Sequence, residues 1–166
     1  MKTEFRCLTV EEIPAGYRLV VERTDWLNQK GIRQWDEPLP EAIFRQRQAD
    51  GSLYGYWVED ELVAVVSLLG RSVSDWGDRL QGSYLYLATL VSAVRYVGQG
   101  YGSGCVKAAC EYAGKMGCGT VYLDCVDTLG ALPAFYRKLG FEQIGEKIWQ
   151  GERRVVLMVK DLQAGG

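Results

Sequence analysis

The stretch YLYLATLVSAVRYVGQGYGSGCVKAAC, residues 84–110, carries the pattern that decides the fold. It predicts a buried strand over Tyr84–Ser92, a glycine-rich loop over Gly98–Ser103 and a helix over Gly100–Met116. Glycines let successive backbone N–H groups point into one concavity, and a helix start adds unpaired donors and a partial positive charge. The stretch therefore predicts a phosphate or pyrophosphate site, with a glycine-rich turn that binds nothing as the alternative.

The glycine spacing disfavours the two common nucleotide-binding loops. The dinucleotide fingerprint GxGxxG fails, because its last glycine is replaced by Ser103 in one register and by Cys105 in the other. The P-loop pattern fails because the sequence contains no Gly-Lys-Ser or Gly-Lys-Thr. A nucleotide-binding protein is therefore a weak interpretation of the loop.

Strand and helix patterns alternate on both sides of this stretch. Further strands are expected at 5–10, 52–58, 61–69, 120–126, 141–149 and 153–160, and further helices at 17–30, 41–49 and 129–139. Segment 11–16 is expected to end the first strand ahead of the first helix. The polar segment 71–81 is expected to form a loop that is long enough to have a function. A hairpin-rich start followed by β-α-β crossovers predicts an α/β fold with a mixed sheet and helices on both faces.

Length and composition fit one ordinary globular domain over 1–162, followed by a disordered tail at 163–166. No apolar run reaches the ~20 residues that a membrane-spanning helix needs. The N-terminal segment MKTEFRCLTVEE lacks the apolar stretch of an export signal, and the five cysteines form no paired spacing. We therefore expect a cytoplasmic protein with free thiols and no membrane partner.

Two properties of the composition exclude classes of function. The net charge is −2, and the basic groups Arg45–Arg47 and Arg153–Arg154 are too short for the basic stripe of nucleic-acid-binding proteins. The sequence contains no histidine and no CxxC pair, which excludes Ser-His and Cys-His nucleophiles and the usual zinc sites. No nucleic-acid partner and no metal are expected.

Three segments together resemble one family. Residues Val97–Gly102 (VGQGYG) resemble the [QR]xxGx[GA] loop of the GCN5-related N-acetyltransferases (GNAT), which grips the pyrophosphate of acetyl-CoA. Leu123–Cys125 and Phe135–Phe141 (FYRKLGF) are similar to the family's late segment LD…FYxKLGF, with the family's interval between loop and segment. Trp26–Trp35 looks like the N-terminal helices of some bacterial members, so the resemblance runs from about residue 5 to 160.

The resemblance implies a central, mostly antiparallel sheet with one splayed parallel pair. It also implies direct transfer of an acetyl group from acetyl-CoA, as co-substrate, to a primary amine of a small molecule or a peptide. Homodimers are common in the family, and the apolar strand Val155–Val159 is a candidate edge for pairing. The positions expected to bind the cofactor are Leu90, Ser92, Val97, Gly98, Gly100, Tyr101, Gly102 and Ser103.

The sequence departs from the family pattern at three points. Val97 stands where the family has Arg or Gln, and a shifted register that begins at Arg95 would move the helix out of line. Leu129 stands where many members have an asparagine that contacts the cofactor, and Tyr84–Ser92 lacks the carboxylate that many members use as base. These departures keep open a second interpretation, a non-catalytic acyl-CoA-binding or sensor domain on the same fold.

Two residues are the expected catalytic groups. Tyr136 matches the tyrosine of the FY segment, and because a phenol is mostly protonated at pH 7 it can protonate the departing thiolate. A packing role beside Phe135 is the alternative. Asp124 is the nearest candidate base, with a structural carboxylate or a chain of waters as alternatives. Cys125 reads as a packing cysteine, since there is no histidine to activate it.

The acceptor cleft is less defined by the sequence. Asp36 and Glu37 are candidates to attract a cationic amine, although an acidic surface explains them equally. Aromatic side chains that either line this cleft or belong to the core are Trp26, Trp35, Tyr54, Tyr56 and Trp76.

Overall fold

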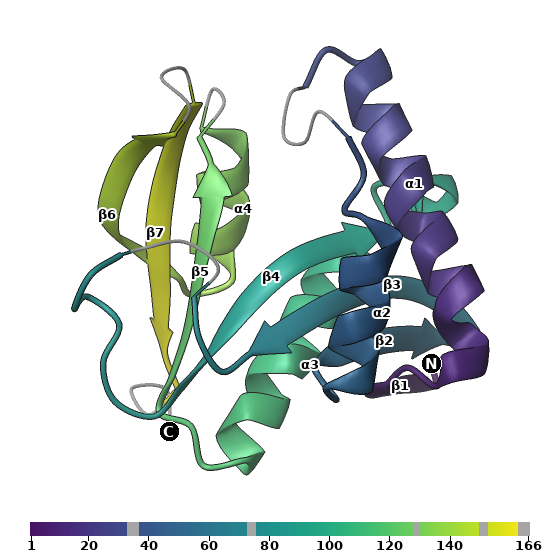
Figure 1. Ribbon diagram of the computed structural model, residues 1–166, viewed down its shortest axis with the longest axis horizontal. Coiled ribbons are helices and arrows are strands. Elements are labelled where there is room, and N and C mark those ends of the chain that lie inside the picture. The colour runs from purple at the N-terminus through teal and green to yellow at the C-terminus, as the bar shows by residue number, and fades with distance from the viewer. Residues whose placement is uncertain (33–36, 73–75, 128–129, 150–152, 163–166) are drawn as a thin grey trace. The chain divides into compact units, whose positions relative to one another are not determined.

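A computed structural model of the chain describes residues 1–32, 37–72, 76–127, 130–149 and 153–162 (Figure 1). In chain order its elements are β1 (Thr3–Cys7), η1 (Val10–Glu12), α1 (Ile13–Gln29), α2 (Glu41–Ala49), β2 (Leu53–Val58), β3 (Glu61–Leu69), β4 (Tyr84–Ser92), η2 (Val94–Tyr96), α3 (Tyr101–Lys115), β5 (Thr120–Val126), α4 (Ala131–Lys138), β6 (Glu142–Trp149) and β7 (Arg153–Asp161).

The strands form a seven-stranded sheet in the order β1-β2-β3-β4-β5-β7-β6. Antiparallel pairs join β1 to β2, β2 to β3, β5 to β7 and β6 to β7, whereas β4 and β5 run parallel. A parallel neighbour needs a crossover connection, and α3 provides it between β4 and β5. The predicted α/β fold, with a mostly antiparallel sheet and one parallel pair, is confirmed.

The chain packs as two compact units, to both of which β4 and α3 contribute. The first consists of residues 1–68 and 89–108, and the second of residues 69–88 and 109–166. A single domain over 1–162 stays a prediction from the sequence, and the tail 163–166 lies outside the described residues.

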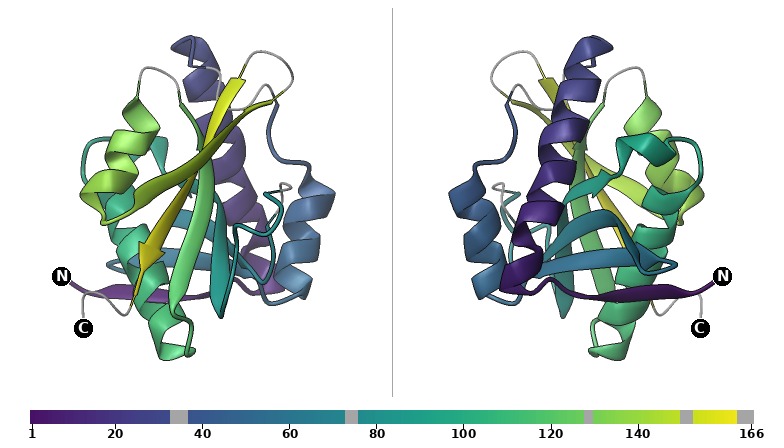
Figure 2. Two further views of the ribbon diagram at one scale, coloured as in Figure 1. Left: turned by 90° about the vertical axis from the view of Figure 1, so that its left-hand side faces the viewer. Right: turned by 90° about the vertical axis from the view of Figure 1, so that its right-hand side faces the viewer.

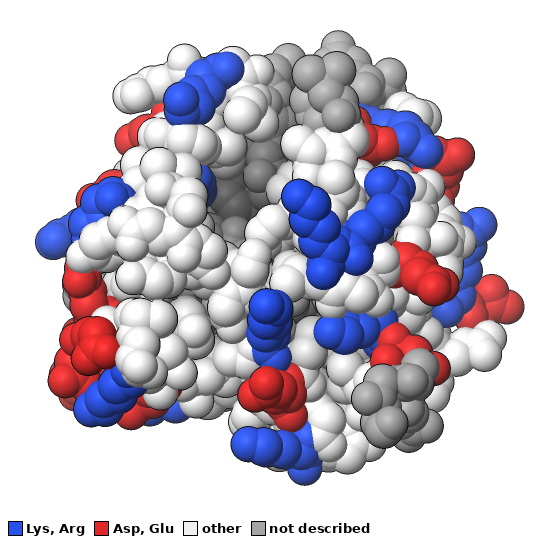
Figure 3. Space-filling model, turned by 180° about the vertical axis from the view of Figure 1, so that it is seen from behind, with Lys and Arg blue, Asp and Glu red and all other residues white. Residues whose placement is uncertain are grey.

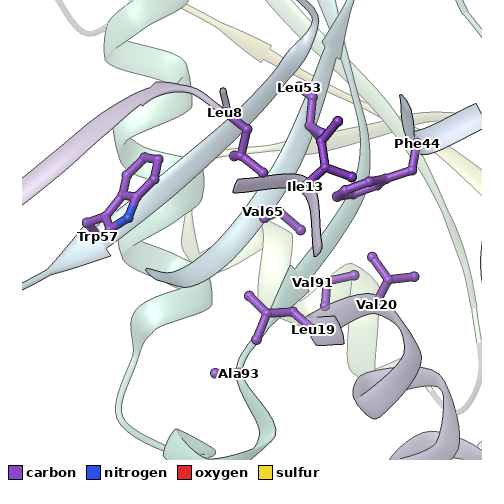
Figure 4. Close-up of a cluster of buried hydrophobic side chains, with 10 residues drawn as sticks. All are labelled: Leu8, Ile13, Leu19, Val20, Phe44, Leu53, Trp57, Val65, Val91 and Ala93. Atoms are coloured by element: carbon purple, nitrogen blue, oxygen red, sulfur yellow. The ribbon is translucent and has the colours of Figure 1, made fainter. Parts of the chain in front are cut away.

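The core of the first unit lies between its sheet and two helices. In Figures 1 and 2, α1 and α2 cover one face of β2 and β3, and the start of α3 covers the other. The close approach of α1 depends on Gly16, because a Cβ there would lie 2.7 Å from Leu8 Cδ2 and 3.2 Å from Phe44 Cζ. The buried cluster under the two helices (Figure 4) consists of Leu8, Ile13, Leu19, Val20, Phe44, Leu53, Trp57, Val65, Val91 and Ala93.

The second unit is built on β5, β7 and β6. Helix α4 packs on one face of these strands (Figures 1 and 2). The buried cluster of this unit consists of Trp76, Tyr86, Tyr122, Val155 and Leu157. Side chains of β5 alternate between the two faces, so even-numbered residues point to this cluster and odd-numbered residues point to α4.

The start of α1 differs from the prediction. The first strand ends at Cys7, and the helix begins at Ile13 instead of residue 17. Pro14 occupies one of the first two helical positions, where a backbone N–H is not needed, so the helix begins inside the segment 11–16 that was expected to separate it from the first strand. The Thr9 N–H donates to the Glu12 carboxylate at 2.9 Å as part of a capping box, which fixes the turn just before the helix.

Charged side chains of both signs and free thiols are found in the described part of the chain. Acidic side chains lie among the basic ones on the face shown in Figure 3. All five cysteines are free thiols, as expected. In the part of the chain that the structure describes, no helix combines the length and apolar character needed to cross a membrane.

Candidate active site

The glycine-rich loop leads directly into the first turn of α3. Gly98 and Gly100 have φ values of +84° and +82°, which favour glycine because an L side chain is strained there. The Gly104 N–H donates to the Gly100 carbonyl at 2.9 Å and closes the first turn. The amides of residues 101–103 precede that bond, so they have no acceptor within the helix. The loop and the helix start thus present open N–H groups at the positive end of a helix, which is the arrangement of an anion site.

Neighbouring side chains fix the register of this loop. A Cβ at Gly104 would lie 2.7 Å from Tyr56 Oη, so Tyr56 on β2 packs directly against the first turn of α3. The Arg95 guanidinium donates to the Glu61 carboxylate at 2.5 and 3.0 Å, which engages it with β3. The Val97 side chain is 56% exposed. Because Arg95 is engaged elsewhere, the register in which Val97 begins the loop motif fits the structure better.

The parallel pair β4–β5 is short. Its register covers Tyr84–Tyr86 on β4 against Thr120–Tyr122 on β5, although β4 runs on to Ser92 and β5 to Val126. Thr89 lies just beyond the paired part, and its φ of +52° is in the left-handed region. The backbone of β4 therefore departs from regular strand geometry at Thr89.

The end of β4 is tied to α1. Arg23 donates to the Ser92 carbonyl from Nε at 3.1 Å and from Nη2 at 2.9 Å, and Nη2 also donates to Ser92 Oγ at 2.9 Å. The next residue, Ala93, donates its N–H to the Val63 carbonyl at 2.8 Å. A carbonyl oxygen has two lone pairs, and the two N–H donors of Arg23 occupy both of those on the Ser92 oxygen.

Asp124 is held by two side chains of the second unit. The Tyr86 hydroxyl and the Trp76 indole N–H, the latter at 3.3 Å, both donate to Asp124 Oδ2. Burial, with a further contribution from the Asp124 charge, raises the pKa of Tyr86 above its usual range, so this phenol stays protonated and keeps donating. Within the described residues, Asp124 Oδ1 accepts no hydrogen bond and the residue is half-buried.

Tyr136 and Cys125 belong to the other side of β5. Tyr136 on α4 is buried, and its ring meets those of Phe135 and Phe141 edge-on at centroid distances of 5.0 and 5.7 Å. Burial raises the pKa of the Cys125 thiol to about 12, and the charge of Arg137 on α4 opposes this slightly. Cys125 therefore faces α4 as a protonated thiol packed on Met158, whereas Asp124, one residue earlier, faces the opposite side.

Comparisons with known proteins agree with this architecture. The sequence profile of the "Acetyltransferase (GNAT) family" matches residues 20–141. An "Uncharacterized N-acetyltransferase YesJ" of Bacillus subtilis (strain 168) is 31% identical over 137 residues, covering 76% of this chain and 74% of the relative. The chain belongs to the GNAT family. The protein is therefore an enzyme of the N-acetyltransferase class, as the family and its named relative indicate.

Solved structures share the GNAT fold. A GNAT-family acetyltransferase of Listeria monocytogenes 4b F2365 aligns with a TM-score of 0.81 at 20% identity, covering 96% of this chain and 94% of that one. The ribosomal-protein-S18-alanine N-acetyltransferase of Escherichia coli aligns with a TM-score of 0.72 at 16% identity, covering 97% and 94%. At these identities the likeness concerns the fold alone.

The aromatic candidates of this GNAT chain have separate surroundings. Trp26 is half-buried, with Arg23 and Lys30 over its ring at 4.7 and 4.8 Å. Tyr54 is buried and stacks on Phe5 at 5.2 Å, which is a packing role. Glu37 is exposed. Trp35, Asp36 and Leu129 lie outside the described residues, so their proposed roles stay predictions from the sequence.

The structure adds side chains that the GNAT motifs did not indicate. Tyr86 and Trp76 reach Asp124 only because β4 and β5 pair in this register, and no spacing in the sequence announces that. Arg47 on α2 donates to Thr89 on β4, across 42 residues of sequence. In the described part of the chain, no cluster of three or more Cys, Asp or Glu side chains suits a metal ion.

Proposed function

We propose that the protein transfers an acetyl group from acetyl-CoA directly to the primary amine of a small molecule or a peptide. The observation that carries this proposal is the glycine-rich turn that ends at Gly100, followed by the amides of residues 101–103, which have no acceptor within α3. Such amides suit a pyrophosphate, which accepts several N–H bonds and carries the charge that a helix start favours. The residues proposed to surround the pyrophosphate are Val97, Gly98, Gly100, Tyr101, Gly102 and Ser103.

The pantetheine arm of the cofactor is proposed to lie along the C-terminal half of β4, at Leu90 and Ser92. The register of β4 with β5 ends at Tyr86, so backbone groups in the C-terminal half of β4 are candidates for hydrogen bonds with the amides of the cofactor. Arg23 already uses the carbonyl of Ser92, which leaves the Ser92 N–H as the group that can serve the cofactor.

The chemical step is proposed to use Tyr136 and Asp124 on different atoms. Asp124 takes a proton from the bound ammonium, and the freed lone pair attacks the thioester carbon. The C–S bond breaks as Tyr136 protonates the leaving thiolate, and the second proton that the nitrogen loses on becoming an amide restores the phenol through water. An acid and a base that act on sulfur and nitrogen need not touch each other, which suits their places on opposite sides of β5. The protonated Cys125 thiol favours direct transfer over an acetyl-cysteine intermediate.

Binding and turnover of acetyl-CoA test this function. Calorimetry should show binding, and a melting curve should shift upward, because a ligand at ~100 Kd stabilises the folded state by about 2.7 kcal/mol. Thiol release should then depend on an amine, tested with polyamines, amino acids and a peptide that begins with alanine. The last is included because the E. coli enzyme of similar fold is named for such an acceptor. Binding without turnover on a broad panel would favour a non-catalytic acyl-CoA sensor, and no binding at millimolar acetyl-CoA would refute the proposal.

Replacing Asp124 with asparagine tests the base. The amide keeps the size of the side chain and an oxygen that Tyr86 and Trp76 can reach, but it cannot accept the proton. We expect kcat/KM for a protonated amine to fall by ~10² or more, the scale of losing a general base. Tyr86→Phe is the matched control, since it removes one donor to Asp124 and leaves the carboxylate. An Asp124→Asn enzyme with an unchanged pH–rate profile would assign Asp124 to a structural role.

A further inference from the structure

The backbone of β4 contains one residue in a strained conformation. Thr89 has a φ of +52°, and a β-branched residue there is an outlier that persists only where the surroundings hold it. The other two described non-glycine residues with positive φ are Glu59 and Asp60, which form the tight turn between β2 and β3. Thr89 lies within a strand instead, so turn geometry does not explain it.

The side chain that holds Thr89 is Arg47. Its Nη1 donates to Thr89 Oγ1 at 2.9 Å and to Ser67 Oγ at 3.1 Å. This one side-chain nitrogen therefore bonds to a residue of β3 and to a residue of β4. Ser67 is buried, with 1% of its surface exposed. The contact therefore lies inside the first unit, where a hydrogen bond is poorly replaced by water.

Arg47 is itself an unusual choice for this place. Its side chain is half-buried, and burial lowers its pKa. Among the described residues, no Asp or Glu forms a salt bridge with it, whereas Arg45 on the same helix pairs with Glu41 at 2.9 Å. A cation taken out of water without a counter-ion is costly, so what it gains must come from the hydroxyls that it binds.

The position of Thr89 gives this contact a consequence for the cofactor. The β4–β5 register ends at Tyr86, three residues before Thr89, and the proposed pantetheine contacts Leu90 and Ser92 follow it. The dihedral angles of Thr89 thus bear on the path of the Leu90–Ser92 backbone within the first unit.

We propose that Arg47 is a positioning residue, which holds Thr89 in its left-handed conformation and so sets the cofactor-binding edge of β4. This inference rests on the proposed function, because it assumes that the pantetheine arm uses Leu90–Ser92. It requires the affinity for pantetheine, rather than the affinity for the pyrophosphate, to depend on Arg47.

The central experiment compares two substitutions at Thr89. Alanine removes the hydroxyl that Arg47 binds but keeps the strain of a side chain at positive φ, whereas glycine adopts that φ freely. We expect T89A to raise the Kd and the KM of acetyl-CoA by ~10-fold or more, since small misplacements of binding groups are costly. T89G should stay within about 3-fold of the wild-type protein.

Substitutions at Arg47 complete the comparison. R47M keeps an apolar stem and should weaken acetyl-CoA binding as T89A does, while R47M in the T89G background should add little, because glycine no longer needs the contact. R45M is the matched control on the same helix, where Arg45 is exposed and paired with Glu41, and it should bind as the wild-type protein does. The T89A and T89G pair decides the matter if R47M does not fold.

A second ligand separates positioning from general damage. 3′-Phospho-ADP carries the pyrophosphate but no pantetheine arm, so its Kd should be the same for the wild-type protein, T89A and R47M. The inference would be overturned if a variant lost affinity equally for both ligands, or if T89A and T89G lost affinity for acetyl-CoA equally. If the wild-type protein binds 3′-phospho-ADP and acetyl-CoA normally but R47M does too, only the inference fails. If the wild-type protein binds neither, the proposed function fails and the inference falls with it.

Discussion

Replacing Gly100 with glutamate should abolish the binding of acetyl-CoA. The residue stands at φ +82°, immediately before the open amides of the α3 start. A glutamate there places a carboxylate beside the N–H groups that the pyrophosphate needs, so its own charge competes for them and repels the phosphates. A Cβ at Gly100 meets no atom within 4 Å, so the substitution brings no clash that would disrupt the fold.

Backbone strain is the effect that must be separated from lost binding. A side chain in the left-handed region costs roughly 1–2 kcal/mol, so the variant should melt below the wild-type protein. Gly51→Glu is a matched control, because Gly51 has a φ of +73° with open space around its Cβ and lies in the turn between α2 and β2. Both variants should lose similar stability, and only Gly100→Glu should lose binding by calorimetry. Retained affinity in Gly100→Glu would remove the loop from the cofactor site.

The conformation of the glycine-rich loop could be predicted from the sequence because the pattern that indicates it is local. Glycines at fixed spacing between an apolar strand and a helix predict both the turn and the open amides, and the structure gives Gly98 and Gly100 positive φ values. The mixed sheet followed from the same kind of local pattern, since a hairpin-rich start and later β-α-β crossovers predict both antiparallel and parallel pairs. The start of α1 was misread because Pro14 was taken as a break, although proline is also favoured at the first helical positions.

The contacts of the candidate residues could not be predicted from local sequence patterns. Asp124 was chosen for its strand, but its contacts with Tyr86 and Trp76 depend on the register of β4 against β5 and on the path of the segment before β4. Likewise, nothing near Thr89 in the sequence indicates its positive φ or the hydrogen bond that its hydroxyl accepts from Arg47 on α2. Contacts between distant segments are set by packing, and a single sequence does not state which side chains meet.

Replacing Tyr136 with phenylalanine should lower kcat while leaving the fold and the affinity for acetyl-CoA nearly intact. Coenzyme A thiolate leaves more readily when it is protonated as the C–S bond breaks, and the phenol of Tyr136 is the proposed proton donor. Phenylalanine keeps the ring and its edge-on contacts with Phe135 and Phe141. We expect kcat to fall by ~10–10³, the range found when one positioned acid or hydrogen-bond donor is lost.

If Tyr136 only packs, its substitution should lower stability slightly and leave kcat unchanged. Tyr17 provides a control for this outcome. The Tyr17 hydroxyl donates to the Leu39 carbonyl at 2.7 Å, so Tyr17→Phe also deletes one partly buried hydrogen bond from the protein. Such a loss costs about 0.5–1.5 kcal/mol of stability and gives no reason for a change in kcat. If Tyr136 is the acid, the two variants should show comparable small shifts in melting temperature, but only Tyr136→Phe should turn over slowly. Because product release can mask the chemical step, kcat must be measured by single turnover, and an unaltered rate there would take Tyr136 out of the mechanism.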